Sequence, residues 1–183
     1  YTAENGEADF AAGIGRLASA GARVIADDVG YFDEPFYQDG IVAQAIDAVN
    51  AQGVAYFSAA GNDGALAYEN LTPQFATTPV SGSGPNAGEK LLNGYPTGVT
   101  TVTALPVTIA SLIPGQYVPI VVEWDQPYVT GAPNSGGATS HIDVCITGAM
   151  GSDAITDLNG NPVNCTGANA SGVDPVQIMM IGI

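Results

Sequence analysis

Basic side chains are nearly absent from this 183-residue sequence, which has 18 Asp and Glu but only Arg16, Arg23 and Lys90 on the basic side. The formal net charge of -15 repels phosphate backbones and anionic membrane surfaces. Long hydrophobic runs are also missing, because no apolar stretch approaches the roughly 20 residues that a membrane-spanning helix needs. We therefore expect no nucleic-acid partner and no membrane partner.

Cysteine and histidine are scarce as well. Cys145 and Cys165 are the only cysteines, His141 is the only histidine, and no Cys-x-x-Cys motif occurs. The sequence therefore predicts no metal site and no cofactor. In an oxidising compartment the two cysteines would close a short loop as a disulfide, and the alternative is a pair of free thiols.

The first third of the sequence has the hydrophobic pattern of an α/β protein. Apolar residues recur at helical spacing over residues 8–22 and 41–49, and Gly21 and Gly53 are placed to end these helices. Short apolar runs over residues 23–28 and 54–58 are typical of buried parallel strands. The order helix, strand, helix, strand predicts part of a doubly wound parallel sheet.

The rest of the sequence has a different pattern. Residues 71–98 are rich in Pro, Gly and Ser, and strands are expected over residues 99–109, 117–124, 141–146 and 176–181, with a hairpin turn at 157–161. We therefore expect two domains, a partial α/β segment over residues 1–66 and a β-sandwich accessory domain over residues 67–183, with residues 71–98 as their connection.

Two parallel strands leave the edges of their sheet open and one face largely uncovered, whereas parallel sheets are normally buried on both faces. We therefore expect further sequence before residue 1. The open edge also suggests self-association or pairing with a partner chain.

The segment Ser58-Ala59-Ala60-Gly61-Asn62 follows the second predicted strand, at the end of a parallel sheet where ligands usually bind. Its small side chains allow a bound peptide backbone to approach closely. The plainer interpretation is a tight turn that ends the strand.

Residues 10–64 resemble the central part of the subtilisin-like serine peptidases. In that family a strand of the form VI-x-x-S-x-G-G, a helix ending in Gly, and a strand leading into A-A-G-N occur in this order, and VIADDVGY, the helix before Gly53, and SAAGND match them here. Residues from 99 onward, especially VVEWDQPY, resemble more loosely the pre-peptidase C-terminal type of sandwich that some of these enzymes carry as an insertion.

The resemblance implies a secreted endopeptidase that acts on protein or peptide substrates. It implies that Asn62 is the catalytic oxyanion-hole residue, that Ala59, Ala60 and Gly61 line the substrate pocket, and that Val29 and Gly30 border the groove. The motifs that carry the family's catalytic Asp, His and Ser do not occur in these residues, so we expect the chain alone to be inactive. His141 lies in the other predicted domain and is expected to be an ordinary strand histidine.

A different class of function is also compatible with the sequence. A non-catalytic binding or adhesion protein would use the β-sandwich for recognition and the α/β segment as scaffold. An α/β-hydrolase is disfavoured because no Gly-x-Ser-x-Gly motif occurs.

Overall fold

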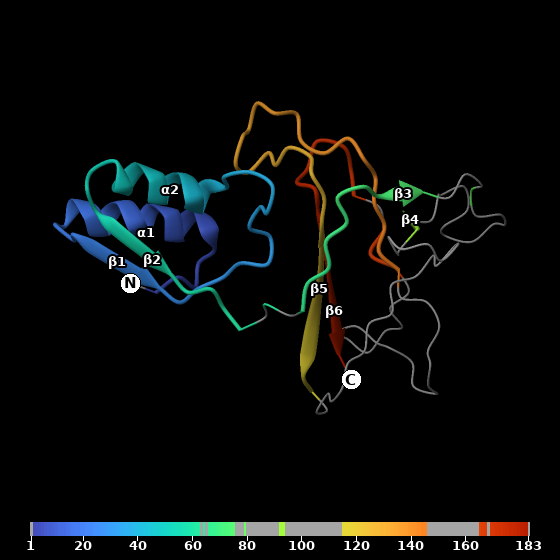
Figure 1. The fold of residues 1–183 in the computed structure, drawn as a ribbon, viewed down its shortest axis with the longest axis horizontal. Coiled ribbons are helices and arrows are strands. Elements are labelled where there is room, and N and C mark those ends of the chain that lie inside the picture. The colour runs from blue at the N-terminus through green and yellow to red at the C-terminus, as the bar shows by residue number, and fades with distance from the viewer. Residues whose placement is uncertain are drawn as a thin grey trace. The chain divides into compact units, whose positions relative to one another are not determined.

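The computed structural model describes residues 2–62, 64, 66–75, 79, 92–93, 115–145, 165–167 and 169–182. Over these residues the protein has a mixed α/β fold with eight helices and strands in the order α1 (Glu7–Ser19), β1 (Val24–Asp27), α2 (Ile41–Asn50), β2 (Ala55–Ser58), β3 (Gln74–Phe75), β4 (Leu92–Asn93), β5 (Tyr117–Glu123) and β6 (Val176–Gly182) (Figure 1). The chain forms two compact units, one of Tyr1–Asn62 with Ile113–Ile183 and one of Asp63–Leu112. The expected domain boundary near residue 66 stays a prediction.

Both helices end in the same way, at a glycine in the left-handed region. Gly21 has a φ of 98° and Gly53 a φ of 82°. After α1 the amide of Gly21 donates to Ala18 and that of Ala22 to Leu17, which is the Schellman arrangement, and α2 ends with the equivalent pair of bonds from Gly53 and Val54. The two glycines therefore end the helices as the sequence pattern predicts.

The strands β1 and β2 pair in parallel, with Val24 opposite Ala55 and Asp27 opposite Ser58. Both helices lie on the same face of this pair (Figure 1). Apolar side chains from α1, β1 and α2 and from the residue before β2 form one core between the helices and the strands, made by Phe10, Ile14, Ile25, Val42, Val49 and Val54, and the partly buried Tyr56 of β2 packs against it. Its formation follows from the helical spacing of the apolar residues.

The other face of this two-stranded sheet is exposed. Val24 and Phe57 are each 62% exposed, and Ala26 and Ala55 on the same face are exposed too. This alternation follows from the strand period of two, which turns successive side chains to opposite faces. Within the described residues β1 pairs only with β2.

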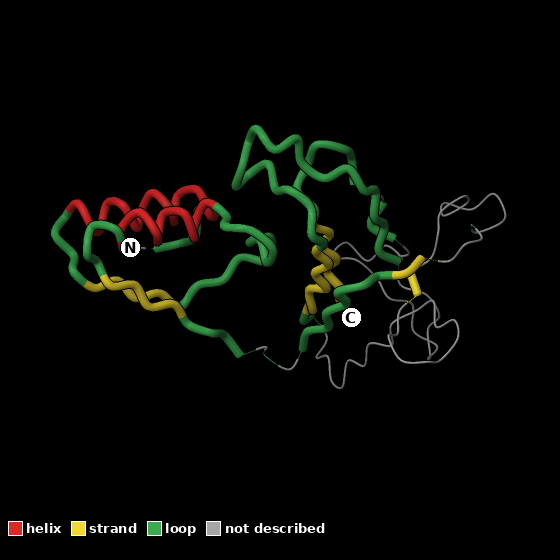
Figure 2. The backbone as a smooth tube through the Cα atoms, turned by 45° about the horizontal axis from the view of Figure 1, so that its top comes forward, coloured by secondary structure: helices red, strands yellow, loops and turns green. Residues whose placement is uncertain are grey.

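The strands β5 and β6 pair antiparallel, from Tyr117 opposite Gly182 to Glu123 opposite Val176 (Figure 2). Met179 and Ile181 of β6 are buried, as is Tyr128 just after β5. Strands were expected in both places, over residues 117–124 and 176–181. A third sheet, β3 with β4, lies in the smaller unit.

The strand expected over residues 141–146 is not formed in its described part. Over residues 141–145 only Cys145 makes a β-bridge, with Cys165. The amides of Ile142 and Val144 instead donate to the side chains of Asn169 and Thr166, because short polar side chains compete with the backbone for such bonds. The expected strand at 99–109 and the turn at 157–161 lie outside the described residues.

No helix in the described part of the chain has the length and apolar character needed to cross a membrane.

Candidate functional site

The candidate site residues lie at the carboxyl ends of β1 and β2. Because the pairing is parallel and Asp27 is opposite Ser58, the segments that follow both strands leave the sheet at the same edge. Val29 and Gly30 follow β1, and Ala59, Ala60, Gly61 and Asn62 follow β2. The structure thus brings both predicted segments to one end of the sheet, and all six residues are exposed there.

The segment after β2 is tied to the end of β1. The amide of Ala59 donates to the carbonyl oxygen of Asp27 over 3.2 Å, which continues the parallel pairing by one residue. Gly61 then takes a φ of 69°, a left-handed conformation in which any other side chain would be strained. The turn at Gly61 redirects the chain, so Asn62 follows the turn and remains exposed.

Sequence reasoning missed a polar cluster under this edge. The carboxylate of Asp27 accepts a hydrogen bond from the Tyr56 hydroxyl at one oxygen and from Ser58 Oγ, 2.8 Å away, at the other. Burial of the phenol, followed by the hydrogen bond to Asp27, raises the pKa of Tyr56. Tyr56 therefore stays protonated and acts as a donor. The cluster braces the ends of both strands. It depends on the parallel register that places Asp27 opposite Ser58, which no local sequence pattern reveals.

The loop between β1 and α2 is acidic, with Asp28, Asp33, Glu34 and Asp39 in twelve residues. Burial raises the pKa of Glu34, and the charges of Asp27, Asp33 and Glu123 raise it further. The loop also presents aromatic rings to solvent, since Phe32 is 55% exposed and Phe36 is 82% exposed.

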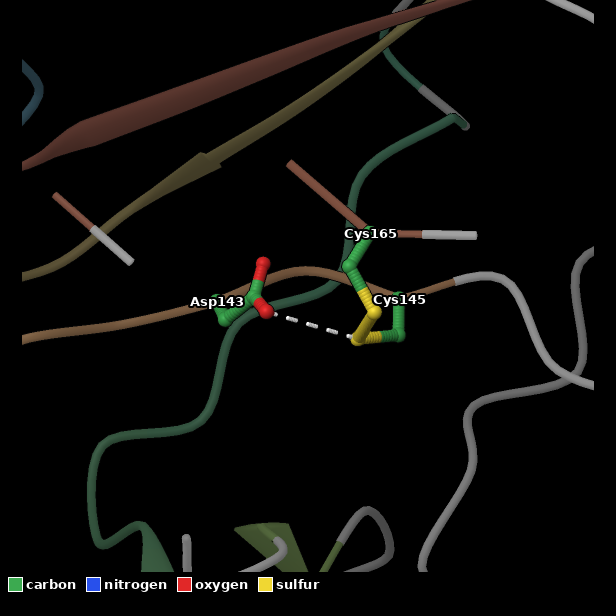
Figure 3. A group of neighbouring side chains, drawn as sticks. All are labelled: Asp143, Cys145 and Cys165. Atoms are coloured by element: carbon green, nitrogen blue, oxygen red, sulfur yellow. Dashed lines mark hydrogen bonds between the residues drawn. A yellow bond between two sulfur atoms is a disulfide. The ribbon is translucent and has the colours of Figure 1, made fainter. Parts of the chain in front are cut away.

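Cys145 and Cys165 form a disulfide in the structure (Figure 3). Asp143 Oδ2 lies 3.7 Å from the sulfur of Cys145, so the three side chains form a group compact enough to suggest a metal site. The two sulfurs are bonded to each other, however, and a metal would need free thiolates. We therefore assign this group a structural role.

His141 also lies in this part of the chain. Its Nδ1 is 2.7 Å from the carbonyl oxygen of Asn169, and its Nε2 is 3.1 Å from Ser171 Oγ. A carbonyl can only accept, so Nδ1 carries a proton and donates it to the carbonyl oxygen of Asn169. These bonds continue the row of contacts between residues 141–145 and 165–171, and we interpret His141 as a link between the two segments.

No protein-family model matches this chain, and neither a curated protein nor a solved structure matches it. Its function therefore has to be argued from its own residues and their placement.

Proposed function

We propose that this chain is part of a secreted subtilisin-like serine endopeptidase and that Asn62 contributes to its oxyanion hole. The observation that supports this most strongly is the position of two exposed segments, Val29-Gly30 and Ala59-Ala60-Gly61-Asn62, at one edge of a parallel strand pair. Ligand contacts in open α/β sheets are made at such an edge. The order of the motifs along the sequence matches the family as well.

The proposed chemistry is acyl transfer. A serine attacks the scissile carbonyl carbon, a histidine accepts the proton from its hydroxyl, and an aspartate orients the histidine. Those three groups would come from outside residues 1–183. Asn62 would donate a hydrogen bond from its side-chain amide to the negative charge that develops on the carbonyl oxygen.

The neighbouring residues would bind the substrate backbone. Val29 and Gly30 on one side and Ala59, Ala60 and Gly61 on the other carry small or no side chains, apart from Val29, and are exposed. A peptide that lies between the two segments could reach backbone groups on both sides. The brace of Asp27, Tyr56 and Ser58 supports this role, since it fixes both segments before substrate binds.

Secretion is part of the proposal. A disulfide persists in oxidising compartments, and the chain has one between Cys145 and Cys165. One apolar face of β1 and β2 is exposed, whereas parallel sheets are normally buried on both faces. We therefore propose that a further element, a partner chain or a second copy covers this face.

The test uses the whole protein encoded around these residues. We expect Asn62→Ala to lower kcat for peptide hydrolysis by about 10² to 10³, as loss of one oxyanion donor does in subtilisin, with little change in KM. Asn50→Ala is the matched control, because Asn50 is also exposed but ends α2 away from the site. Equal kcat values for the two variants would refute the role of Asn62.

A second measurement tests whether the catalytic Asp, His and Ser lie outside these 183 residues. The 183-residue chain alone is expected to leave a generic protein substrate uncut. Hydrolysis by this chain that a serine-directed inhibitor blocks would contradict the proposed division of the catalytic groups.

A further inference from the structure

Ser171, His141 and Asn169 form a chain of hydrogen bonds outside the candidate site. His141 Nε2 lies 3.1 Å from Ser171 Oγ, and Nδ1 of the same ring lies 2.7 Å from the carbonyl oxygen of Asn169. A serine within hydrogen-bond reach of an imidazole that a third group orients has the arrangement of an activated nucleophile. The proposed peptidase chemistry uses none of these three groups.

The two ring nitrogens of His141 have different roles. Because the Asn169 carbonyl can only accept, Nδ1 carries a proton, and in the neutral imidazole Nε2 therefore carries none. Nε2 can then accept the proton of the Ser171 hydroxyl, as a general base does. The Asn169 carbonyl orients the ring through Nδ1, which is the part that an aspartate has in a Ser-His-Asp triad.

The backbone beside His141 is held in place. Asn169 Oδ1 accepts a hydrogen bond from the amide of Ile142, the next residue, over 2.7 Å. Gln177 Nε2 donates to the Ile142 carbonyl over 3.0 Å. Ile142 is thus bonded through both of its backbone groups, so the imidazole has a defined position before any substrate arrives.

The backbone beside Ser171 is held as well. The amide of Gly172 donates to the Ala138 carbonyl over 2.9 Å, and the Ala138 amide donates to the Val173 carbonyl over 2.8 Å. Gly172 has a φ of 79°, so the chain turns sharply directly after Ser171. Ser171 and His141 are both exposed, and a small molecule can therefore reach them.

We propose that Ser171 and His141 form a nucleophilic site of their own, which hydrolyses small uncharged esters. The Ser171 oxygen attacks the carbonyl carbon of the ester while Nε2 takes the hydroxyl proton. The bond to the leaving alcohol then breaks, and the alcohol oxygen takes this proton from Nε2. Water attacks the acyl-serine with His141 again as base, which releases the acid and restores the Ser171 hydroxyl.

The substrate class follows from the surroundings of the pair and from the chemistry. The formal net charge of -15 repels anionic esters. An ester is more reactive than a peptide bond, so this site can act on it without the binding groove that a peptidase needs. The inference is therefore independent of the proposed peptidase, and the expectation that this chain alone leaves a protein substrate uncut stands.

Labelling of the 183-residue chain with diisopropyl fluorophosphate tests the nucleophile, because this small uncharged reagent phosphorylates activated serines irreversibly. Peptide mass spectrometry after increasing times measures the labelling rate of each serine. We expect Ser171 to react about 10² times faster than Ser19, an exposed serine at the end of α1, because general-base catalysis contributes at least that factor. Equal rates at Ser171 and Ser19 overturn the proposal.

The variant His141→Gln keeps a polar side chain but removes the base, so labelling at Ser171 should fall to the rate of Ser19. Unchanged labelling of Ser171 in this variant would refute the role of His141. Should the variant fail to fold, the comparison of Ser171 with Ser19 in the wild-type chain still decides.

Turnover of p-nitrophenyl acetate tests the reaction. We expect the wild-type chain to release more than one equivalent of p-nitrophenol and Ser171→Ala to lose most of this activity, whereas the control Ser19→Ala keeps it. Full activity in Ser171→Ala would make the imidazole itself the nucleophile and overturn the role of Ser171.

Discussion

The α/β region of residues 2–62 and the β5–β6 region of residues 115–145 and 165–182 belong to one compact unit but are held together differently. The first is built around one apolar core from both helices, β1 and Val54, and the partly buried Tyr56 of β2 packs against this core. In the second, side chains such as Gln126, Thr166, Asn169 and Gln177 bond to the backbone of distant loops. Local periodicity is enough to specify the first kind of structure, whereas the second depends on partners that lie far away in the sequence.

The largest expected effect is in the α/β core. Ile14 is 1% exposed, so Ile14→Ala removes buried methyl groups and leaves a cavity, and it should lower the free energy of unfolding by about 2 to 5 kcal/mol. Leu17→Ala on the same helix is the control, because Leu17 is 37% exposed and should cost much less. Urea unfolding followed by far-UV circular dichroism measures both, and equal losses would show that this core is not closely packed.

A smaller effect is expected where the β5–β6 region relies on a polar side chain. Gln126 Oε1 accepts bonds from Trp124 Nε1 and from the amides of Thr139 and Ser140, at 3.1, 3.0 and 2.9 Å. Gln126→Ala removes this acceptor and should lower the free energy of unfolding by about 1 to 2 kcal/mol. The loss is no larger because the partly exposed amides can then bond to water.

The control for Gln126 is Gln52→Ala. The side chain of Gln52 is exposed, and among the described residues it bonds only to the carbonyl oxygen of Ala48, one turn earlier. Gln52→Ala should therefore lower the free energy of unfolding by no more than about 0.5 kcal/mol in the same urea titration. If both glutamine variants lost the same small amount, the contrast between the two regions would not hold.

The smallest expected effects are those of two glycine-to-alanine substitutions, which should change the stability of the protein in opposite directions. Gly15 is helical and has open space at its Cβ position, so Gly15→Ala should raise stability by about 0.5 to 1 kcal/mol through the helix propensity of alanine. Gly131→Ala should lower it, because the added Cβ meets the backbone of Asp39 and Gly40. Thermal unfolding midpoints would show the two shifts, and a loss of stability in both variants would contradict the open space at Gly15.

The sequence predicted the α/β region well because each of its signals is local. The helical stripes, the glycines at positions 21 and 53, and the apolar runs before Asp28 and Ala59 all lie within a few residues of the structure that they specify. The same spacing placed Asn62 and Val29 at one edge of the sheet. The brace of Asp27, Tyr56 and Ser58 was missed because it depends on the pairing register, which no single segment contains.

The β5–β6 region was predicted only in part for the opposite reason. Alternating apolar residues indicated strands near 117 and 176, and both formed. Residues 141–145 carry a similar alternation, yet their amides bond to the side chains of Asn169 and Thr166, more than twenty residues away. Nor does any local pattern reveal that Gln38 pairs with the backbone of Tyr128, ninety residues later.

The long separation between β5 and β6 has a consequence for how the protein reaches its native state. About fifty residues lie between the two strands, whereas about twenty lie between α1 and α2, so closing the β5–β6 pair costs more chain entropy and is slower. During synthesis the α/β region can therefore assemble first, while β5 waits unpaired for β6 to emerge. An unpaired β5 exposes the apolar side chains of Val118, Ile120, Val121 and Val122, and Pro119 within the strand removes one backbone donor and so limits its pairing with another chain.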